Sequence, residues 1–323
     1  MTVNLAFIGA GGIASTHLEH LRSHEGAAVV AVCDINETVA QTAAQPHDAA
    51  VFTDHRAMYE QCSFDAVVIA VPPFAHTDQE RLAGEAGVDC FVEKPLGLDA
   101  TTVRERARTL AEVNVITQVG HMTRYADSLE RARALIGERT VSLVDAHWWC
   151  GVPGDEDHWW RSKDHSGGQV IEQATHTYDV VRQFAGDVTS VSAVGGNAVN
   201  TEALDFEDST AAVLEHETGT ISQVSATSTA SEFSHTVRLA GDGFALTLDL
   251  GDDRLTGTIG GESIAFQGNG EMYAKELDAF VEAVETRDQS LCRSPYDDAL
   301  ATFETTIAVD QALRTGEPQE VAK

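Results

Sequence analysis

The chain has very little lysine and little positive charge. Only four of its 323 residues are lysines, and its 21 basic side chains are outnumbered by 51 acidic ones, which gives a formal net charge of −30. Such a surface repels phosphate backbones, so we expect no nucleic-acid partner. The acidic residues are spread along the chain rather than gathered in a tail. We interpret them as a solvated acidic surface adapted to a salt-loaded cytoplasm.

Long hydrophobic runs and patterned cysteines are also missing. No stretch approaches the roughly 20 apolar residues of a membrane-spanning helix, and the first residues lack the basic segment of a signal peptide. The five cysteines are scattered, odd in number, and form no CxxC pair or metal-ligand spacing. We therefore expect a cytoplasmic protein with no membrane partner and no structural metal.

The first part of the chain alternates short apolar runs with helical patterns. Its length favours two domains. The apolar runs are continuous rather than alternating, as in strands that are buried on both faces. Alternating strands and helices predict a doubly wound parallel Rossmann sheet over residues 1–122. The expected strands are 3–8, 28–33, 66–71, 88–92 and 115–119, and the expected helices are 13–23, 36–44, 76–86 and 99–113.

The pattern changes after about residue 122. A helix is expected near 124–136, followed by runs in which apolar and polar residues alternate. Such alternation is typical of antiparallel strands with one buried face. Residues 123–323 are thus predicted to form an α+β domain with a mostly antiparallel open sheet. Its expected strands are 141–149, 188–199, 208–216, 220–229, 235–240 and 244–250, and its closing helices are 272–288 and 295–314.

A glycine-rich turn follows the first expected strand. It reads Gly9-Ala10-Gly11-Gly12-Ile13-Ala14, a GxGxxA pattern. Gly9 permits the tight turn, Gly11 lets the backbone approach a pyrophosphate, and the small Ala14 lets the helix pack closely on the strand. The helix that starts here directs its free N–H groups at the phosphates. The turn predicts a dinucleotide site made by residues Gly9, Gly11, Gly12, Ile13 and Ala14.

Asp34 ends the second expected strand, twenty residues after Ala14. An acidic residue at this place binds the adenosine ribose hydroxyls of a dinucleotide. Its charge repels a 2′-phosphate, and Ile35 and Asn36 supply no cation to offset that repulsion. NAD is therefore favoured over NADP. The alternative is an ordinary turn aspartate after a strand.

Three segments together resemble the Gfo/Idh/MocA oxidoreductases. They are the glycine turn with His17, the Glu93-Lys94-Pro95 sequence after the expected strand at 88–92, and residues 167–179, and they occur in family order. The resemblance spans nearly the whole chain. It implies a sugar, a polyol or a related hydroxy compound as small-molecule substrate. It also implies a homodimer or homotetramer formed through the C-terminal sheet.

Lys94 stands at the carboxyl end of a central parallel strand, the edge at which open α/β sheets bind their ligands. The resemblance implies that this lysine reaches the substrate oxygen, where a cation stabilises a developing alkoxide. Glu93 and Lys94 are also expected to contact the cofactor. The loop that contains Pro72 and His76 is expected to flank the nicotinamide ribose.

Glu172 and His176 are four residues apart in a helix expected to run to about residue 184. Asp179 continues the same stripe. We assign His176 as the general base, because histidine titrates near neutral pH. The family commonly has aspartate at the position of Glu172. The longer side chain leaves its role open: Glu172 orients His176, binds a substrate hydroxyl, or does both. The alternative is a solvent-facing stripe or a core histidine with satisfied hydrogen bonds.

Trp159 and Arg161 lie shortly before this helix. A tryptophan face stacks on the C–H surface of a sugar, and an arginine binds an anionic group. Both are therefore candidate substrate-binding residues. Packing in the core is an equal alternative for Trp159, and pairing with neighbouring acids is one for Arg161.

Together these residues predict an NAD-dependent dehydrogenase that transfers a hydride between nicotinamide and a secondary alcohol. One alternative is a hydrolase or lyase that oxidises its substrate transiently with tightly held NAD. Another is a non-catalytic NAD-binding regulator, although the full set of Lys94, Glu172 and His176 argues against it.

The charge imbalance makes a prediction about salt. Activity and stability are expected to rise with molar salt, because screening weakens the repulsion among the acidic side chains. Thermal unfolding followed across a KCl series checks this, and a protein that is most stable at low salt would contradict it.

Overall fold

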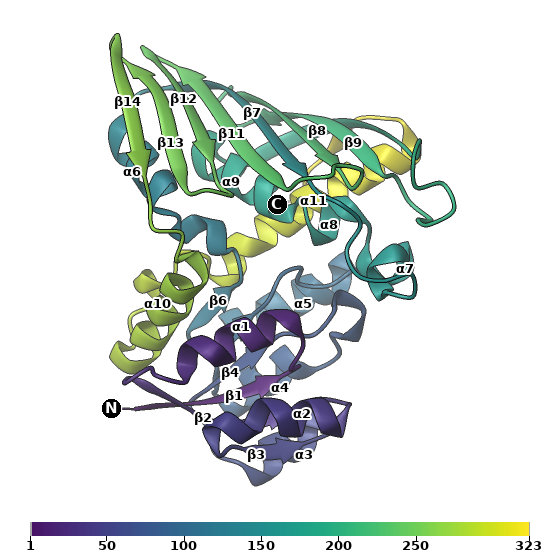
Figure 1. Ribbon diagram of the computed structural model, residues 1–323, viewed down its shortest axis with the longest axis vertical. Helices are drawn as coiled ribbons and strands as arrows, with labels where there is room; N and C mark the ends of the chain where they lie inside the picture. The colour runs from purple at the N-terminus through teal and green to yellow at the C-terminus, as the bar shows by residue number, and fades with distance from the viewer. Residues whose placement is uncertain (1, 323) are drawn as a thin grey trace. The chain divides into compact units, whose positions relative to one another are not determined.

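The structure is a computed structural model that describes residues 2–322 and divides into two compact units (Figure 1). The first unit combines the chain up to Met122 with Met272–Leu300. The second combines Thr123–Glu271 with the chain from Ala301 onward. The expected change of character near residue 122 therefore coincides with a boundary, but the chain crosses between the units twice more.

A six-stranded parallel sheet forms the centre of the first unit. The strand order is β3-β2-β1-β4-β5-β6, and every neighbouring pair is parallel, as a doubly wound fold requires. Every residue of β4 and β5 is buried, which agrees with their continuous apolar sequence. The strands are β1 (Val3–Ile8), β2 (Ala27–Cys33), β3 (Ala50–Phe52), β4 (Ala66–Ile69), β5 (Asp89–Val92) and β6 (Thr117–Val119).

The helices of the first unit include one short element that the sequence pattern did not predict. This is α3, which follows the equally unpredicted strand β3, whose three residues are exposed or half-buried. So short an edge strand carries no buried apolar run to reveal it. The helices are α1 (Gly12–Leu21), α2 (Glu37–Ala44), α3 (His55–Gln61), α4 (Gln79–Ala86), α5 (Ala100–Ala111) and α10 (Met272–Thr286), with 3₁₀ turns at Gln45–His47, Pro73–Ala75 and Gln289–Leu291.

Helix α10 belongs to the first unit, although the sequence pattern placed residues 272–288 in the second domain. Its Leu277 and Phe280 are fully buried in the same hydrophobic core as Leu5 and Phe7 of β1. The rings of Phe280 and Phe91 meet edge to face, with centroids 5.7 Å apart. Periodicity identifies the apolar face of such a helix, but it does not say which surface covers that face.

The second unit is built on a nine-stranded sheet in the order β14-β13-β12-β11-β7-β10-β9-β8-β15. Among the described strand pairs of this sheet, only β7–β10 is parallel, so the prediction of a mostly antiparallel open sheet is confirmed. The strands are β7 (Val141–Trp149), β8 (Val188–Gly196), β9 (Ser209–His216), β10 (Ile221–Thr227), β11 (Ser234–Gly241), β12 (Phe244–Asp249), β13 (Arg254–Ile259), β14 (Glu262–Gln267) and β15 (Gln319–Glu320).

Helices cover one face of this sheet, and the other face is open (Figure 1). Side chains of β9 alternate between buried and exposed accordingly. The helices are α6 (Asp127–Ile136), α7 (Lys163–Ser166), α8 (Gln169–Glu172), α9 (Thr175–Ala185) and α11 (Tyr296–Thr315), with 3₁₀ turns at Met122–Tyr125 and Trp159–Arg161. Within residues 2–322, none of the helices has the length and apolar character needed to span a membrane.

The placement of α10 makes a prediction about stability. Phe280→Ala is expected to lower the free energy of unfolding by about 3–5 kcal/mol, because it leaves a cavity in the core beneath the parallel sheet. Urea denaturation measures the change. Glu282→Ala, at an exposed position of the same helix, is the control. Equal effects of the two substitutions would contradict the burial of Phe280 in this core.

Candidate functional site

The glycine turn has the backbone shape that a dinucleotide site needs. Gly9 has φ +90°, and a Cβ atom there would lie 2.3 Å from the carbonyl oxygen of Ala70, so only glycine fits. At Gly11 and Gly12 a Cβ atom would meet nothing within 4 Å. Gly11 is the N-cap of α1, and no side chain caps this helix terminus. The turn therefore brings the backbone of Gly9 close to that of Ala70 after β4 and leaves the N-terminus of α1 open.

Asp34 holds the turn to the end of β2. Its carboxylate accepts hydrogen bonds from the backbone N–H of Ala10, at 3.0 Å, and of Asn36, at 2.9 Å. The side chain is half-buried. Each carboxylate oxygen has a second lone pair, so Asp34 retains the capacity to accept hydrogen bonds from ribose hydroxyls.

These residues fit NAD. The open N-terminus of α1 suits a pyrophosphate, because its N–H groups and the positive end of the helix dipole face the same way. The half-buried Asp34 suits the ribose, and its neighbour Ile35, which is 95% exposed, offers no positive charge to a 2′-phosphate.

Glu93 connects the glycine-turn helix to the loop that carries Lys94. Its Oε1 lies 2.8 Å from Nε2 of His17 on α1, and both side chains are buried. Its Oε2 accepts a hydrogen bond from the backbone N–H of Lys94, at 3.2 Å. A Cβ atom at Gly120 would lie 2.5 Å from that same oxygen, so a larger residue there would displace the Glu93 carboxylate. The contacts of Glu93 are thus internal, and they hold the half-exposed Lys94 at the carboxyl edge of β5.

His76, expected beside the cofactor, is buried against α4. Its Nδ1 lies 2.7 Å from Oε1 of Glu80, and both side chains are at most 1% exposed. Burial alone would raise the pKa of Glu80, but the charges of His76 and Arg106 outweigh it and lower that pKa below its ordinary value of 4.5. The ring of His76 is therefore part of a buried charged network.

Arg106 of α5 completes this network and joins two loops of the sheet edge. Its guanidinium donates to the backbone carbonyls of His76 and Thr77, each at 3.0 Å, and of Leu96 at 3.2 Å. Leu96 follows the Lys94-Pro95 sequence, and His76 follows the Pro72–Pro73 turn. Sequence reasoning missed Arg106 and Glu80, because buried charges in amphipathic helices look like ordinary surface residues until the partners are known.

In the second unit, Glu172 and His176 do not share one regular helix. Glu172 ends α8, Gln173 and Ala174 interrupt the helix, and His176 lies in the first turn of α9. The predicted continuous helix is therefore wrong, and so is the helical-stripe argument that rested on it. Glu172 is half-buried and His176 is 3% exposed.

Two tryptophans position these side chains. Nε1 of Trp160, which is 1% exposed, donates a hydrogen bond to Oε2 of Glu172 at 2.7 Å. The indole of Trp148 stacks on the imidazole of His176, with centroids 5.5 Å apart and an interplanar angle of 25°. The same indole donates from Nε1 to Oε1 of Gln173, at 3.2 Å. An indole N–H can only donate a hydrogen bond. Both tryptophans therefore need an oxygen acceptor, which is the carboxylate of Glu172 for Trp160 and the amide carbonyl of Gln173 for Trp148.

The remaining candidates have structural partners. Trp159 packs, half-buried, against the apolar cluster that contains Trp160. Nε of Arg161 donates to the backbone carbonyl of Asp155, at 2.7 Å. Asp179 is fully buried and accepts hydrogen bonds from Nε of Arg124, at 2.8 Å, and from Thr302, at 2.9 Å. Asp179 therefore braces α9 against Arg124 and Thr302.

Two family models match this chain in succession. Residues 3–121 match the Gfo/Idh/MocA oxidoreductase family with an NAD-binding Rossmann fold, and residues 132–246 match a Gfo/Idh/MocA C-terminal domain. The chain belongs to the Gfo/Idh/MocA family. The predicted family, fold, oxidoreductase class and NAD as cofactor are thereby confirmed.

Several relatives of this Gfo/Idh/MocA protein have been named. It is 30% identical over 214 residues to 2,7-anhydro-N-acetylneuraminate hydratase of Mediterraneibacter gnavus, a match that covers 64% of this chain and 56% of the relative. It is 29% identical to scyllo-inositol 2-dehydrogenase (NAD(+)) of Bacillus subtilis, over 99% of this chain and 96% of the relative. Levoglucosan dehydrogenase in complex with NADH has the same fold, with a TM-score of 0.88 at 17% identity and full coverage of both chains.

The buried network makes a prediction about pH. The pKa of Glu80 is lower in the folded protein, so its contribution to stability is complete above its ordinary value of 4.5 and is lost as the pH falls through the lowered value. Glu80→Gln removes one partner of a buried pair, which costs about 3–5 kcal/mol at neutral pH, and it should make stability less dependent on pH below 4.5.

Chemical denaturation at a series of pH values measures both effects. The control is Glu85→Gln on the same helix, where the side chain is 55% exposed. Arg106→Lys, which keeps the positive charge but cannot donate to three carbonyls at once, serves as a milder variant if Glu80→Gln fails to fold. An unchanged acid profile in both network variants would refute the account of Glu80.

Proposed function

We propose that this protein oxidises a secondary alcohol of a sugar or polyol with NAD, in a reversible reaction. The observation that supports this most directly is the buried Glu93–His17 pair, which joins the loop of Lys94 to the helix that begins at the glycine turn. It ties a cation at the sheet edge to the element built for a dinucleotide. The named relatives that act on inositol and levoglucosan support the substrate class.

In this proposal Lys94 and His176 act on the same alcohol. NAD, when bound, supplies the group that accepts the hydride from the carbinol carbon. The ammonium of Lys94 stabilises the alkoxide that develops on the substrate oxygen, and His176 accepts the hydroxyl proton as general base.

Glu172 has a separate part in the proposed mechanism. Trp160 donates to one oxygen of Glu172 and so holds the carboxylate in one orientation. We propose that this carboxylate orients His176, binds a substrate hydroxyl, or does both. We further propose that Trp159 and Arg161 line the substrate side, with Arg161 held by the carbonyl of Asp155.

The test is reduction of NAD across a panel of polyols and aldoses. Lys94→Ala and His176→Ala are each expected to lower turnover by about 10²–10⁴-fold, the range for loss of a general acid–base group, and to leave NAD affinity within a few-fold of the unsubstituted protein. Calorimetry measures that affinity.

Matched controls are a lysine and a histidine elsewhere in the same units. Lys275 lies on α10, and His165 lies at an exposed position of α7. Neither Lys275→Ala nor His165→Ala should alter turnover. If both Lys94→Ala and His176→Ala remain fully active, the proposed mechanism is wrong.

A second candidate is elimination or hydration with transient oxidation of the substrate, in which NAD is reduced and reoxidised in each cycle. The 30% identity to a hydratase favours keeping it, and the same side chains would serve. Product that forms without accumulation of NADH, on cofactor that copurifies with the protein, would select this candidate. Tight NAD binding with no turnover of any substrate would instead indicate a regulator.

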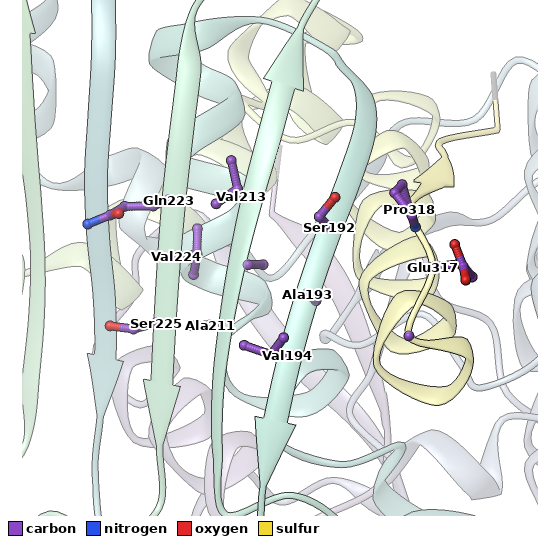
Figure 2. Close-up of a pocket in the computed structure, with 12 residues that line it drawn as sticks. Ser192, Ala193, Val194, Ala211, Val213, Gln223, Val224, Ser225, Glu317 and Pro318 are labelled. Atoms are coloured by element: carbon purple, nitrogen blue, oxygen red, sulfur yellow. The ribbon is translucent and has the colours of Figure 1, made fainter.

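We also propose that the chain forms a homodimer or homotetramer through the open face of its nine-stranded sheet. Large apolar side chains are exposed there on neighbouring strands: Leu143, Trp149, Val194, Val213 and Ile221. A groove of about 480 Å³ lies between β8, β9 and β10 and the Gly316–Pro318 turn (Figure 2). An apolar patch of this kind on a sheet face is typical of a subunit interface.

Charge introduced into this face tests the assembly. Val213→Lys combined with Val194→Lys is expected to give monomers in sedimentation velocity, because each buried lysine would lose its hydration without a partner. Val199→Lys is the control, since Val199 is also exposed but lies outside the strands. A monomeric unsubstituted protein, or an oligomer unaffected by the double substitution, would contradict the proposal.

We also propose that the protein is located in the cytoplasm. All five cysteines have free thiols, and three of them are buried. Unpaired thiols persist in reducing compartments, which supports the assignment.

A further inference from the structure

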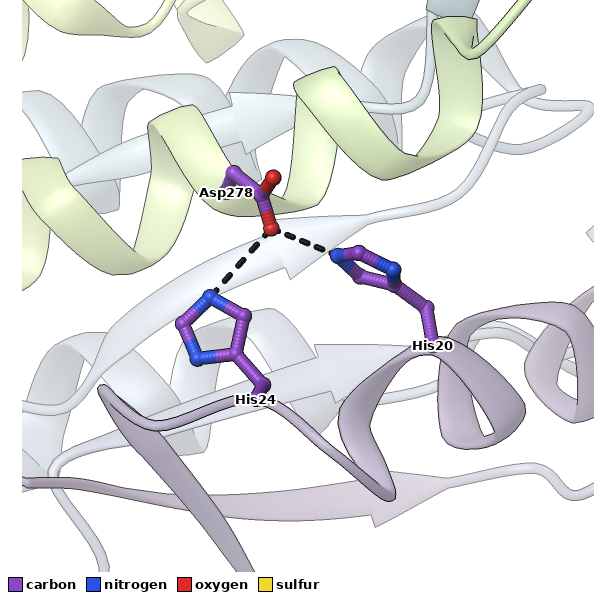
Figure 3. A group of neighbouring side chains, drawn as sticks. All are labelled: His20, His24 and Asp278. Atoms are coloured by element: carbon purple, nitrogen blue, oxygen red, sulfur yellow. Dashed lines mark hydrogen bonds and ion pairs between the residues drawn. The ribbon is translucent and has the colours of Figure 1, made fainter.

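Two histidines and one aspartate meet at the surface of the first unit. His20 lies in the last turn of α1, at the opposite end of that helix from the glycine turn. His24 lies in the loop that precedes β2, and Asp278 lies on α10. Figure 3 shows both imidazole rings directed at the same carboxylate. Because 258 residues separate His20 from Asp278, no local sequence pattern reveals this cluster.

The three side chains have the spacing of a metal centre. Nε2 of His20 lies 2.6 Å from Oδ1 of Asp278, and Nε2 of His24 lies 3.2 Å from the same oxygen. All three candidate ligand atoms are within 4.8 Å of one another. Bonds of about 2.0–2.2 Å in a tetrahedral zinc site place neighbouring ligand atoms roughly 3.3 Å apart. Small side-chain rotations are therefore enough to place one ion among the three atoms.

We propose that His20, His24 and Asp278 bind one divalent transition-metal ion, with Zn²⁺ as the best match, and that the ion links α1 to α10. Two imidazoles and one carboxylate suit Zn²⁺ and its neighbours, whereas Mg²⁺ prefers oxygen ligands alone. The side chains are 31%, 19% and 49% exposed, so water can fill the remaining coordination position. The net charge of −30 raises the local concentration of cations.

Ion binding requires a change in the hydrogen bonding of His24. The backbone N–H of Gly26 donates to Nδ1 of His24 at 3.1 Å, so the neutral ring carries its proton on Nε2, the nitrogen that lies 3.2 Å from Oδ1 of Asp278. A metal ion takes the lone pair of Nε2, and the ring proton then resides on Nδ1. The Gly26 bond is given up in that state, so faster hydrogen exchange at the Gly26 amide is a specific signature of occupancy.

Calorimetric titration of untagged protein with ZnCl₂, after treatment with EDTA, tests the proposal. One Zn²⁺ per chain is expected. Loss of a residue that only hydrogen-bonds to a metal ligand lowers metal affinity by roughly 10–100-fold. His20→Gln and His24→Gln each remove a ligand itself, so each should weaken Zn²⁺ binding by more than that. His47→Gln is the matched control, because His47 is a half-buried histidine of the same unit outside the cluster. MgCl₂ should produce no comparable heat.

Thermal unfolding supplies an independent measurement that does not depend on activity. Zn²⁺ is expected to raise the melting temperature of the unsubstituted protein and of His47→Gln, but not that of His20→Gln or His24→Gln, because an ion that binds only the folded state stabilises it. Absence of binding, or stoichiometric binding that survives both cluster substitutions, would overturn the proposal. Neither result bears on the oxidation of alcohols, which is tested separately.

Discussion

The buried pair of His17 and Glu93 is the interaction on which the first unit's site depends. Glu93 follows β5 and His17 lies on α1, so a single hydrogen-bonded contact of 2.8 Å fixes the helix that begins at the glycine turn relative to the strand end that carries Lys94. A carboxylate buried without its partner is costly. The fold therefore tolerates little displacement of either element, and the cation at the sheet edge is held in a defined place.

Charged groups in the interior serve the same purpose beside this pair. Glu80 is fully buried, and its cost is offset by His76 and Arg106. Arg106 also donates hydrogen bonds to three backbone carbonyls from two loops, and carbonyls in the interior need such partners. The loops that contain His76 and Leu96 have no regular secondary structure of their own at these residues. The buried Arg106 fixes their shape through hydrogen bonds to their backbone carbonyls.

In the second unit, aromatic residues hold the two candidate catalytic side chains. Because the chain breaks between α8 and α9, Glu172 and His176 do not lie on one helix. Trp160 holds Glu172 by a hydrogen bond, and Trp148 holds His176 by stacking. Planar indoles combine a large apolar surface with one hydrogen-bond donor. They can therefore pack as core residues and still fix a polar side chain. This is why Trp148 and Trp160 remain almost fully buried while contacting polar groups.

By itself, the sequence determined the local features of this protein: the parallel strands, the glycine turn before α1, Asp34 at the end of β2 and Lys94 at the end of β5. Each follows from residue types within a few positions of one another, where chain geometry dictates the outcome. Only the tertiary structure decided that α10 covers the parallel sheet, that Glu80 and Arg106 anchor the loops, that Trp160 contacts Glu172, and that His20 meets Asp278. Those contacts join residues far apart in the chain, and an apolar face or a single charge does not specify its partner until the whole core has packed.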